Sequence, residues 1–112
     1  MIKPDKPANE AQRLDALYRY RILDSEREKS FDDLVVIAKA VCGTSMAAVT
    51  LIDVERQWFK SINGTSALEL PRDDSMCGHA ILKPREVMVV EDAQQDVRFH
   101  DNPLVTGDPH VR

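Results

Sequence analysis

Hydrophobic and polar positions alternate with helical spacing near the start of the chain, over residues 9–22. The apolar positions of this stretch are Ala11, Leu14, Leu17, Tyr18 and Ile22. Residues three and four apart share one face of a helix, so the spacing predicts an amphipathic helix. Asn9, with Gln12 three residues later, resembles a capping box at its start. The apolar stripe serves either core packing or pairing with a second copy, and the sequence leaves both open.

A second helical stretch is the more regular of the two. Ser30 and Asp33 provide a start signal, and Gly43 provides a stop. Between them, apolar residues follow the helical repeat closely: Phe31, Leu34, Val35, Ala38, Val41 and Cys42. Because Cys42 falls on this stripe, we expect it to be a small buried hydrophobe rather than a reactive thiol.

Short apolar runs then predict strands. Residues 46–53 are nearly continuously apolar, which is typical of a strand covered on both faces. Residues 57–62 follow a short polar connection, so the two runs predict a hairpin. The apolar residues 87–90 predict a third strand. Helices before the hairpin and a strand among short helices after it indicate an α+β fold with an antiparallel sheet.

The remaining segments are polar or short. Residues 1–8 are expected to be a flexible lead, and residues 65–74 a loop. Asp73 or Asp74 is expected to cap a short helix over 75–82, which ends before Pro84. We expect a loop with one helical turn at 92–99 and an irregular end to the chain.

Composition narrows the class of protein. The chain has 112 residues, 43% of them hydrophobic, and a formal net charge of −4, which indicates one globular domain and a poor binder of nucleic acid or anionic membranes. No apolar run reaches the roughly 18 residues needed to span a bilayer. The N-terminus does not resemble a signal peptide, so we expect a cytoplasmic protein with two reduced cysteines.

Cys77 and His79 form the most reactive-looking pair in the chain. Side chains two apart on a helix point to nearly opposite sides, so the pair is not expected to share a metal ion. A position near a helix start would make the Cys77 thiol more reactive, whereas the neighbouring Asp73 and Asp74 would make it less so. We favour an inward Cys77 beneath a pocket, with His79 facing a loop or a ligand.

Eight ordered blocks carry a family resemblance. They are Asn-Glu-Ala-x-Arg-Leu-x-Ala-Leu (9–17), Ile-Leu-Asp (22–24), Phe-Asp-x-Leu (31–34), Leu-Ile-Asp (51–53), Arg-Gln-Trp-Phe-Lys (56–60), Pro-Arg-Asp-x-Ser-x-Cys-x-His-Ala-Ile (71–81), Val-Val-x-Asp-Ala (89–93) and Asp-x-Arg-Phe-x-Asp-Asn-Pro-Leu-Val (96–105). From residue 9 onward the chain resembles the GAF sensory domain at the N-terminus of bacterial histidine kinases and diguanylate cyclases, which are proteins of two-component and related signal transduction.

The resemblance implies an antiparallel sheet flanked by helices, with a small-molecule pocket between the sheet and the short helices and loops. The residues that it places at this ligand-binding pocket are Phe59, Cys77, His79, Asp92, Arg98 and Phe99. In phytochrome-type relatives a cysteine directly before a histidine tethers a bilin. Here Gly78 stands between the two, so we expect no bilin and no other cofactor. The cysteine arrangement of the methionine-sulfoxide-reducing branch is not present.

Relatives of this type continue with further strands, which lie in the sheet between the first hairpin and the strand expected at 87–90. Residues 9–112 are therefore expected to form an incomplete GAF domain that lacks its last strands and an output module. We expect no catalysis, an unknown small-molecule ligand, and relay of the signal to that output module. Two alternatives stay open: a thiol-based redox sensor or enzyme using Cys77, and a dimerisation scaffold without a ligand.

The missing strands generate a prediction. An unpaired apolar edge along residues 46–53 recruits another chain, so we expect self-association through this edge or through the N-terminal helix, or else marginal stability. Light scattering at high protein concentration measures the association. A monodisperse monomer with a cooperative melt would contradict the expectation.

Overall fold

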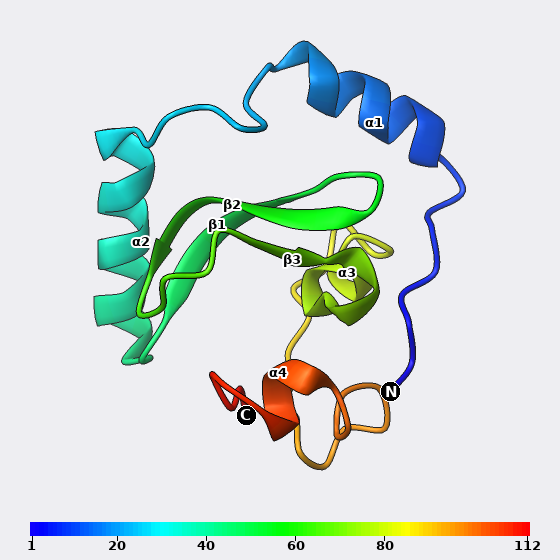
Figure 1. Ribbon diagram of the computed structural model, residues 1–112, viewed down its shortest axis with the longest axis vertical. Helices are drawn as coiled ribbons and strands as arrows, with labels where there is room; N and C mark the ends of the chain where they lie inside the picture. Colours follow the sequence, from blue (N-terminus) through cyan, green and yellow to red (C-terminus); the bar gives the residue numbers. More distant parts are fainter.

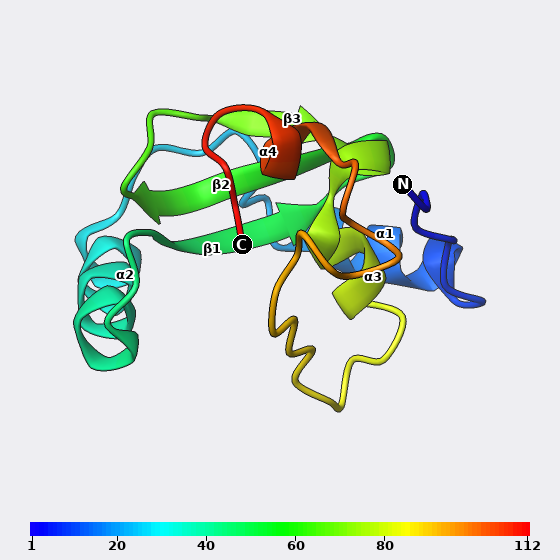
Figure 2. The ribbon, with the colours of Figure 1, turned by 90° about the horizontal axis from the view of Figure 1, so that it is seen from below.

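The computed structural model describes residues 1–112 and has the expected α+β architecture, an antiparallel sheet with helices on both sides (Figure 1). The elements are α1 (Glu10–Arg19), α2 (Lys29–Cys42), β1 (Ala47–Ile52), β2 (Arg56–Asn63), β3 (Glu69–Pro71), the 3₁₀ turn η1 (Arg72–Asp74), α3 (Met76–Ala80) and α4 (Pro103–Thr106). Turned by 90°, the molecule shows α4 and the C-terminal residues crossing one face of the sheet (Figure 2). No helix is long and apolar enough to cross a membrane.

The sheet has the strand order β1-β2-β3, and both pairings are antiparallel. The predicted hairpin is confirmed: Leu51 pairs with Trp58 and Ala48 with Ile62. A bulge lies within it, because Val49 pairs with Ser61 while the next residue of β1 pairs with Phe59. β1 therefore lies at the edge of the sheet, with a neighbouring strand on one side only.

The third strand was predicted in the wrong place. Residues 87–90 form no strand, whereas Glu69–Pro71, within the expected loop, pairs with β2. Val87 is 89% exposed and Val89 is 73% exposed, while Met88 and Val90 pack on a small core of Ala93, Phe99 and Val105. The segment thus has the alternation of a strand, but it lacks the partner strand that a ladder requires.

The helix ends depend on local residues, and two of the predicted helix caps differ in the structure. Gly43 stops α2 in the left-handed conformation with φ 63°, as predicted. Asn9 precedes α1, but its side chain makes no capping hydrogen bond. The cap of α3 is neither Asp73 nor Asp74: the Ser75 side chain accepts the Gly78 N–H at 2.9 Å, because Ser75 is the residue directly before the first helical turn.

The expectation of a buried Cys42 is wrong: the thiol is exposed. α2 packs on the hairpin through a narrow stripe that includes the buried Val35, and Lys39 Nζ donates to Asn63 Oδ1 at 2.8 Å. No other element covers the far side of the helix, where Leu34, Ile37 and Val41 are exposed by 57%, 58% and 80%.

A buried arginine joins α1 to the sheet. The Arg72 side chain, 5% exposed, contacts the Glu10 carboxylate at 2.5 Å. It also donates to the backbone carbonyls of Asp53 at 3.1 Å and Val54 at 3.3 Å, in the β1–β2 turn. Arg13 donates to the same Glu10 carboxylate at 2.8 and 3.0 Å. One carboxylate and one guanidinium therefore fix α1, the turn and η1 together.

These hydrogen bonds lower the pKa of the Glu10 carboxyl. Hydrogen bonds from Arg72 and then Arg13 lower the pKa of Glu10 from 4.5 to about 2. The ionised carboxylate therefore stabilises the fold fully above the unfolded-state pKa, and this contribution is lost as the pH falls toward the folded-state pKa.

A second ionic cluster lies beside the first at the same turn. Tyr18 Oη donates to Asp53 Oδ1 at 2.8 Å, and Arg56 Nε donates to Asp53 Oδ2 at 3.0 Å. Arg56 also holds Asp24 with two hydrogen bonds of 2.7 and 2.8 Å. Burial raises the pKa of Asp53, but the hydrogen bonds from Tyr18, the Val54 N–H and Arg56 outweigh it and lower the pKa overall.

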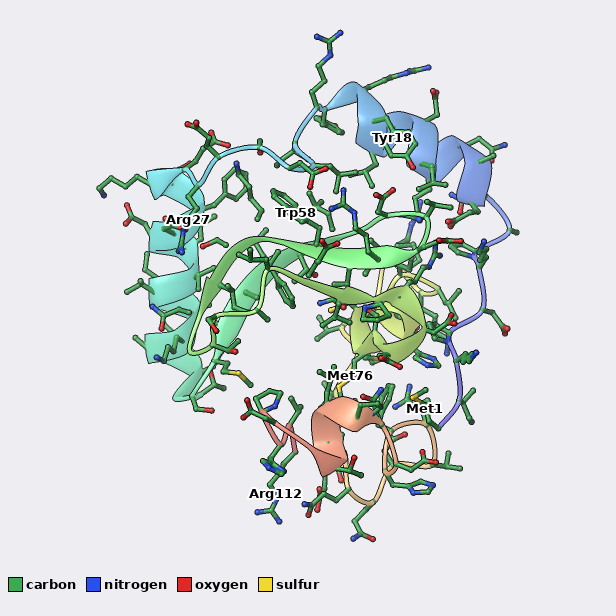
Figure 3. All side chains as sticks on the ribbon, viewed as in Figure 1. Met1, Tyr18, Arg27, Trp58, Met76 and Arg112 are labelled. Atoms are coloured by element: carbon green, nitrogen blue, oxygen red, sulfur yellow. The ribbon has the colours of Figure 1, made fainter.

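The face of the sheet toward α1 and α2 carries a buried lysine. The Lys60 ammonium donates to Ser25 Oγ at 2.8 Å and to the Glu26 carbonyl, and it pairs with Glu28 at 2.8 Å. Trp58 lies on this same face, whereas Met76 lies on the face toward α4 (Figure 3). The two sides of the sheet therefore differ: ion pairs hold the α1–α2 side, and short helices cover the other.

We predict that Glu10→Gln lowers the free energy of unfolding near pH 7 by about 2–3 kcal/mol, because it leaves buried Arg72 without its counter-charge. Urea unfolding followed by Trp58 fluorescence measures this. The variant should also lose part of the wild-type stability change between the unfolded-state pKa of 4.5 and the folded-state pKa of about 2. Glu91→Gln, at an exposed position, is the matched control. Equal behaviour of the two variants would contradict the assigned role of Glu10.

Candidate functional site

An open apolar cavity of about 420 Å³ lies between the sheet and the short helices. Its lining comes from β1, β2, β3 with the loop before it, the start of α3, α4 and the C-terminal segment: Met46, Ala47, Ala48, Thr50, Gln57, Phe59, Ile62, Thr65, Ala67, Leu70, Met76, Cys77, Leu104, Pro109 and Val111. The volume falls in the range of small-molecule sites. This position, between sheet and short helices, is where the resemblance implies a ligand pocket.

One hydrogen-bond chain positions α3 against the cavity. Ser75 Oγ accepts the Gly78 N–H at 2.9 Å and donates to Gln57 Oε1 on β2. Asn102, at the start of α4, links this helix to η1, because its Nδ2 donates to the Asp74 carbonyl at 3.0 Å. The Val111 N–H donates to the Leu104 carbonyl at 2.8 Å and closes the C-terminal side. Backbone and buried polar groups thus hold the wall that carries Cys77.

Cys77 and His79 point to different sides of α3. Cys77 is half-buried and lines the sheet cavity with Phe59. His79 lies on the other side, where its ring meets Phe99 edge-on at 5.2 Å between centroids and its Nε2 lies 2.9 Å from the Ile2 carbonyl. The geometry offers no hydrogen bond from histidine to thiol.

The remaining residues of the expected pocket lie away from the sheet cavity. Arg98 is held by Asp96 through side-chain hydrogen bonds of 2.9 and 2.8 Å, which lower the pKa of Asp96 to about 2. The Arg98 guanidinium lies 4.8 Å from the centre of the Phe99 ring. Asp92 accepts the Gln94 N–H at 3.0 Å and shapes the turn. Of the six expected site residues, only Phe59 and Cys77 therefore line the sheet cavity.

Residues 1–7, which are most of the lead expected over residues 1–8, lie along α3 rather than apart from it (Figure 1). The Ile2 N–H donates to the Arg98 carbonyl at 3.1 Å. A Cβ atom placed on Gly78 would meet Pro4 Cγ at 2.8 Å, closer than side chains tolerate. Glycine between Cys77 and His79 thus lets the N-terminal segment cross α3 at this point.

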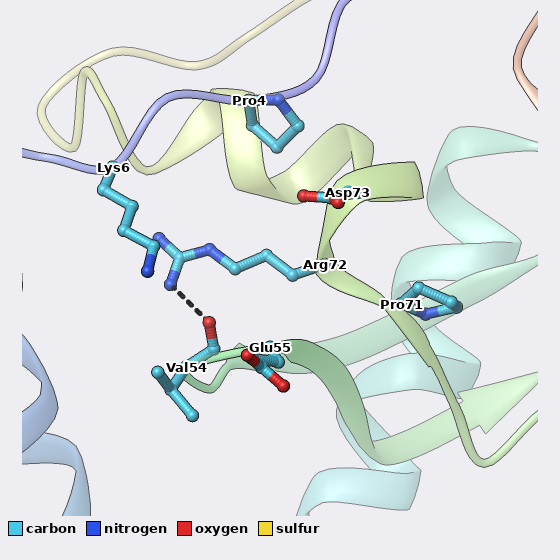
Figure 4. A pocket seen from close by; sticks show the side chains of 7 residues that line it. All are labelled: Pro4, Lys6, Val54, Glu55, Pro71, Arg72 and Asp73. Carbon is cyan, nitrogen blue, oxygen red and sulfur yellow. Dashed lines mark hydrogen bonds between the residues drawn. The ribbon is translucent and has the colours of Figure 1, made fainter.

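A second, polar pocket of about 350 Å³ lies beneath the same N-terminal segment (Figure 4). Its charged residues are Lys6, Glu55, Arg72 and Asp73. Arg72 enters it while donating to the Val54 carbonyl, and its charge is already paired with Glu10. The charges of the pocket are mixed in sign, so it does not favour an ion of either sign.

Sequence reasoning missed several residues of these sites. Gln57 and Ser75 meet across the cavity wall, and Leu104 and Val111 reach it from the end of the chain. The only sequence signal was Ser75 itself, because serine is favoured directly before the first turn of a helix. No group of three or more His, Cys, Asp or Glu side chains is arranged to hold a metal ion.

Comparison with known proteins gives one informative relative. The chain is 34% identical over all its 112 residues to Cyclic di-GMP phosphodiesterase PA2567 of Pseudomonas aeruginosa, of which it spans 19%. No family model matches the chain. The similarity therefore covers the whole of this chain and about a fifth of a longer protein.

We predict that native Cys77 reacts with iodoacetamide at least about tenfold more slowly than Cys42, because burial limits access to the thiol. The variants Cys42→Ser and Cys77→Ser isolate the two thiols, and mass spectrometry follows labelling. In urea the two rates should converge. A native Cys77 that reacts faster than Cys42 would contradict this and support the thiol-based alternative.

Proposed function

We propose that this chain is a non-catalytic sensory module, of the GAF type that its sequence resembles, in a cyclic di-GMP signalling protein. The observation that carries the proposal is the apolar cavity between sheet and short helices, with Phe59 and Cys77 in its wall. The signalling context rests on the relative named a cyclic di-GMP phosphodiesterase. In this proposal, any phosphodiesterase activity belongs to other parts of such a protein.

The separation of Cys77 from His79 favours sensing over thiol chemistry. A catalytic cysteine is activated by a base within hydrogen-bond reach or by a neighbouring positive charge. His79 instead lies against Phe99 and the Ile2 carbonyl. Cys77 then serves as part of the cavity wall, as an apolar side chain of moderate size.

The relay in this proposal is a shift between two states of association. A ligand changes such an equilibrium only through different affinities for the two states. The edge of β1 is a better association surface than α1, because β1 pairs with a strand on one side only. The α1 stripe is already used inside the chain, where Leu17 is buried and Tyr18 binds Asp53. Residues of β1 also line the cavity, so a ligand there would contact the strand that associates.

We predict that N-phenyl-1-naphthylamine, an uncharged fluorescent probe, binds the chain at one saturable site and raises its melting temperature. Ala48→Phe, which places a ring in the cavity, should weaken binding at least about tenfold, a loss of 1.4 kcal/mol or more. Ala16→Phe, at an exposed position on α1, is the matched control and should bind normally.

Each outcome separates the proposals. Saturable binding that Ala48→Phe weakens and Ala16→Phe preserves supports a ligand-sensing module. Absence of saturable binding in the folded wild-type chain would overturn ligand sensing and favour a dimerisation scaffold.

A further inference from the structure

The cavity lining carries no charged side chain. We propose that the cavity takes an uncharged, largely apolar small molecule with one hydrogen-bond acceptor, and that it rejects anions such as the phosphodiesters of cyclic nucleotides. This inference rests on the proposed function, because it names the class of ligand for the same cavity.

The lining is mostly hydrophobic and offers no counter-charge to an anion. Eleven of the 15 lining residues are hydrophobic, and the others are Thr50, Gln57, Thr65 and Pro109. An anion that enters such a site loses hydration without gaining a counter-charge, which costs several kcal/mol even after partial compensation. An uncharged apolar molecule gains from burial in the same place.

Arg72, Arg98 and Lys60 are already paired with carboxylates, so none of them is free to bind an anion in the cavity. Arg72 binds Glu10, and Arg98 binds Asp96 on the far side of α3. Lys60 lies on the opposite face of the sheet against Glu28. Arg112 is exposed and lines a neighbouring hollow rather than this cavity, so it supplies a charge only outside the rim.

Gln57 supplies the hydrogen-bond donor. The residue is 5% exposed, and its Oε1 accepts from Ser75 Oγ. Ser75 Oγ also accepts the Gly78 N–H, and because its own hydrogen points to Gln57 Oε1, the Gln57 amide turns its Nε2 away from Ser75. The Nε2 hydrogens of Gln57 have no acceptor within the chain. Nε2 is therefore a free donor that is not fully buried, and a carbonyl or ether oxygen on the ligand could accept from it.

A matched pair of probes tests the charge selectivity. N-phenyl-1-naphthylamine and 1-anilinonaphthalene-8-sulfonate share one ring system, and only the second carries an anionic sulfonate. The uncharged probe should bind at least about tenfold more tightly. The titrations are repeated with Arg112→Gln, which removes the exposed cation beside the rim. Cyclic di-GMP should not displace the uncharged probe.

Adding one charge to the wall should reverse the preference. Ala48 is exposed at the cavity, so Ala48→Lys places an ammonium there with little disturbance of the fold. This variant should improve the affinity for the sulfonate probe relative to the uncharged probe by about tenfold. Ala48→Met, of similar length without charge, should keep the wild-type preference. Thr50→Lys repeats the test at a second position.

A second pair of ligands tests the acceptor. 2-Acetylnaphthalene and 2-isopropenylnaphthalene have nearly the same shape, but only the first has a carbonyl oxygen. The ketone should compete with the uncharged probe at least as well as the alkene, although water solvates the ketone better. Clearly stronger competition by the alkene would overturn the role of Gln57.

The outcomes distinguish this inference from the proposed function. If both naphthylamine probes bind in the cavity with equal affinity, the ligand class is wrong while ligand sensing stands. If cyclic di-GMP displaces the probe, the exclusion of anions is wrong. If neither probe binds the folded wild-type chain, the proposed function itself fails.

Discussion

The ion pair between Arg72 and Glu10 is the constraint on which the rest of the molecule depends. Arg72 follows β3 directly and precedes α3, and its buried guanidinium reaches α1 and the β1–β2 turn at once. A buried charge without its partner is strongly unfavourable, so this contact fixes where η1 begins. That position in turn determines where Ser75 caps α3 and where Cys77 meets the sheet. An ionic contact on one side of the chain thus sets the shape of an apolar cavity on the other.

α3 separates two environments within five residues, Met76–Ala80. Met76 and Cys77 face an apolar cavity, while His79 lies against the Phe99 ring and the Ile2 carbonyl. Gly78 stands between them and admits Pro4. Cys77 and His79, which resemble a reactive pair in the sequence, therefore lie on two separate sides of α3. This division is why we propose ligand binding on the sheet side of α3 and a structural contact on the other side.

Local signals predicted well, and signals that needed a distant partner did not. The periodicity and Gly43 predicted α2, and adjacent apolar runs predicted the hairpin, because both depend on residues close in sequence. The stripe on α2 could not show whether another element covers it, so Cys42 was placed inside although it is exposed. Residues 87–90 alternate without a partner strand, and β3 exists only because β2 lies beside it. In the site, the opposed directions of Cys77 and His79 followed from helix geometry, whereas Leu104 and Val111 reach the cavity only through the fold.

The central claim is that the ligand site lies on the sheet side of α3 alone. Backbone amide chemical shifts of the ¹⁵N-labelled chain, recorded with and without saturating N-phenyl-1-naphthylamine, test it most directly. We expect large changes at Thr50, Gln57, Phe59 and Cys77, with His79, Asp92 and Arg98 little affected. Changes centred on His79 and Arg98, with the sheet residues unmoved, would contradict it.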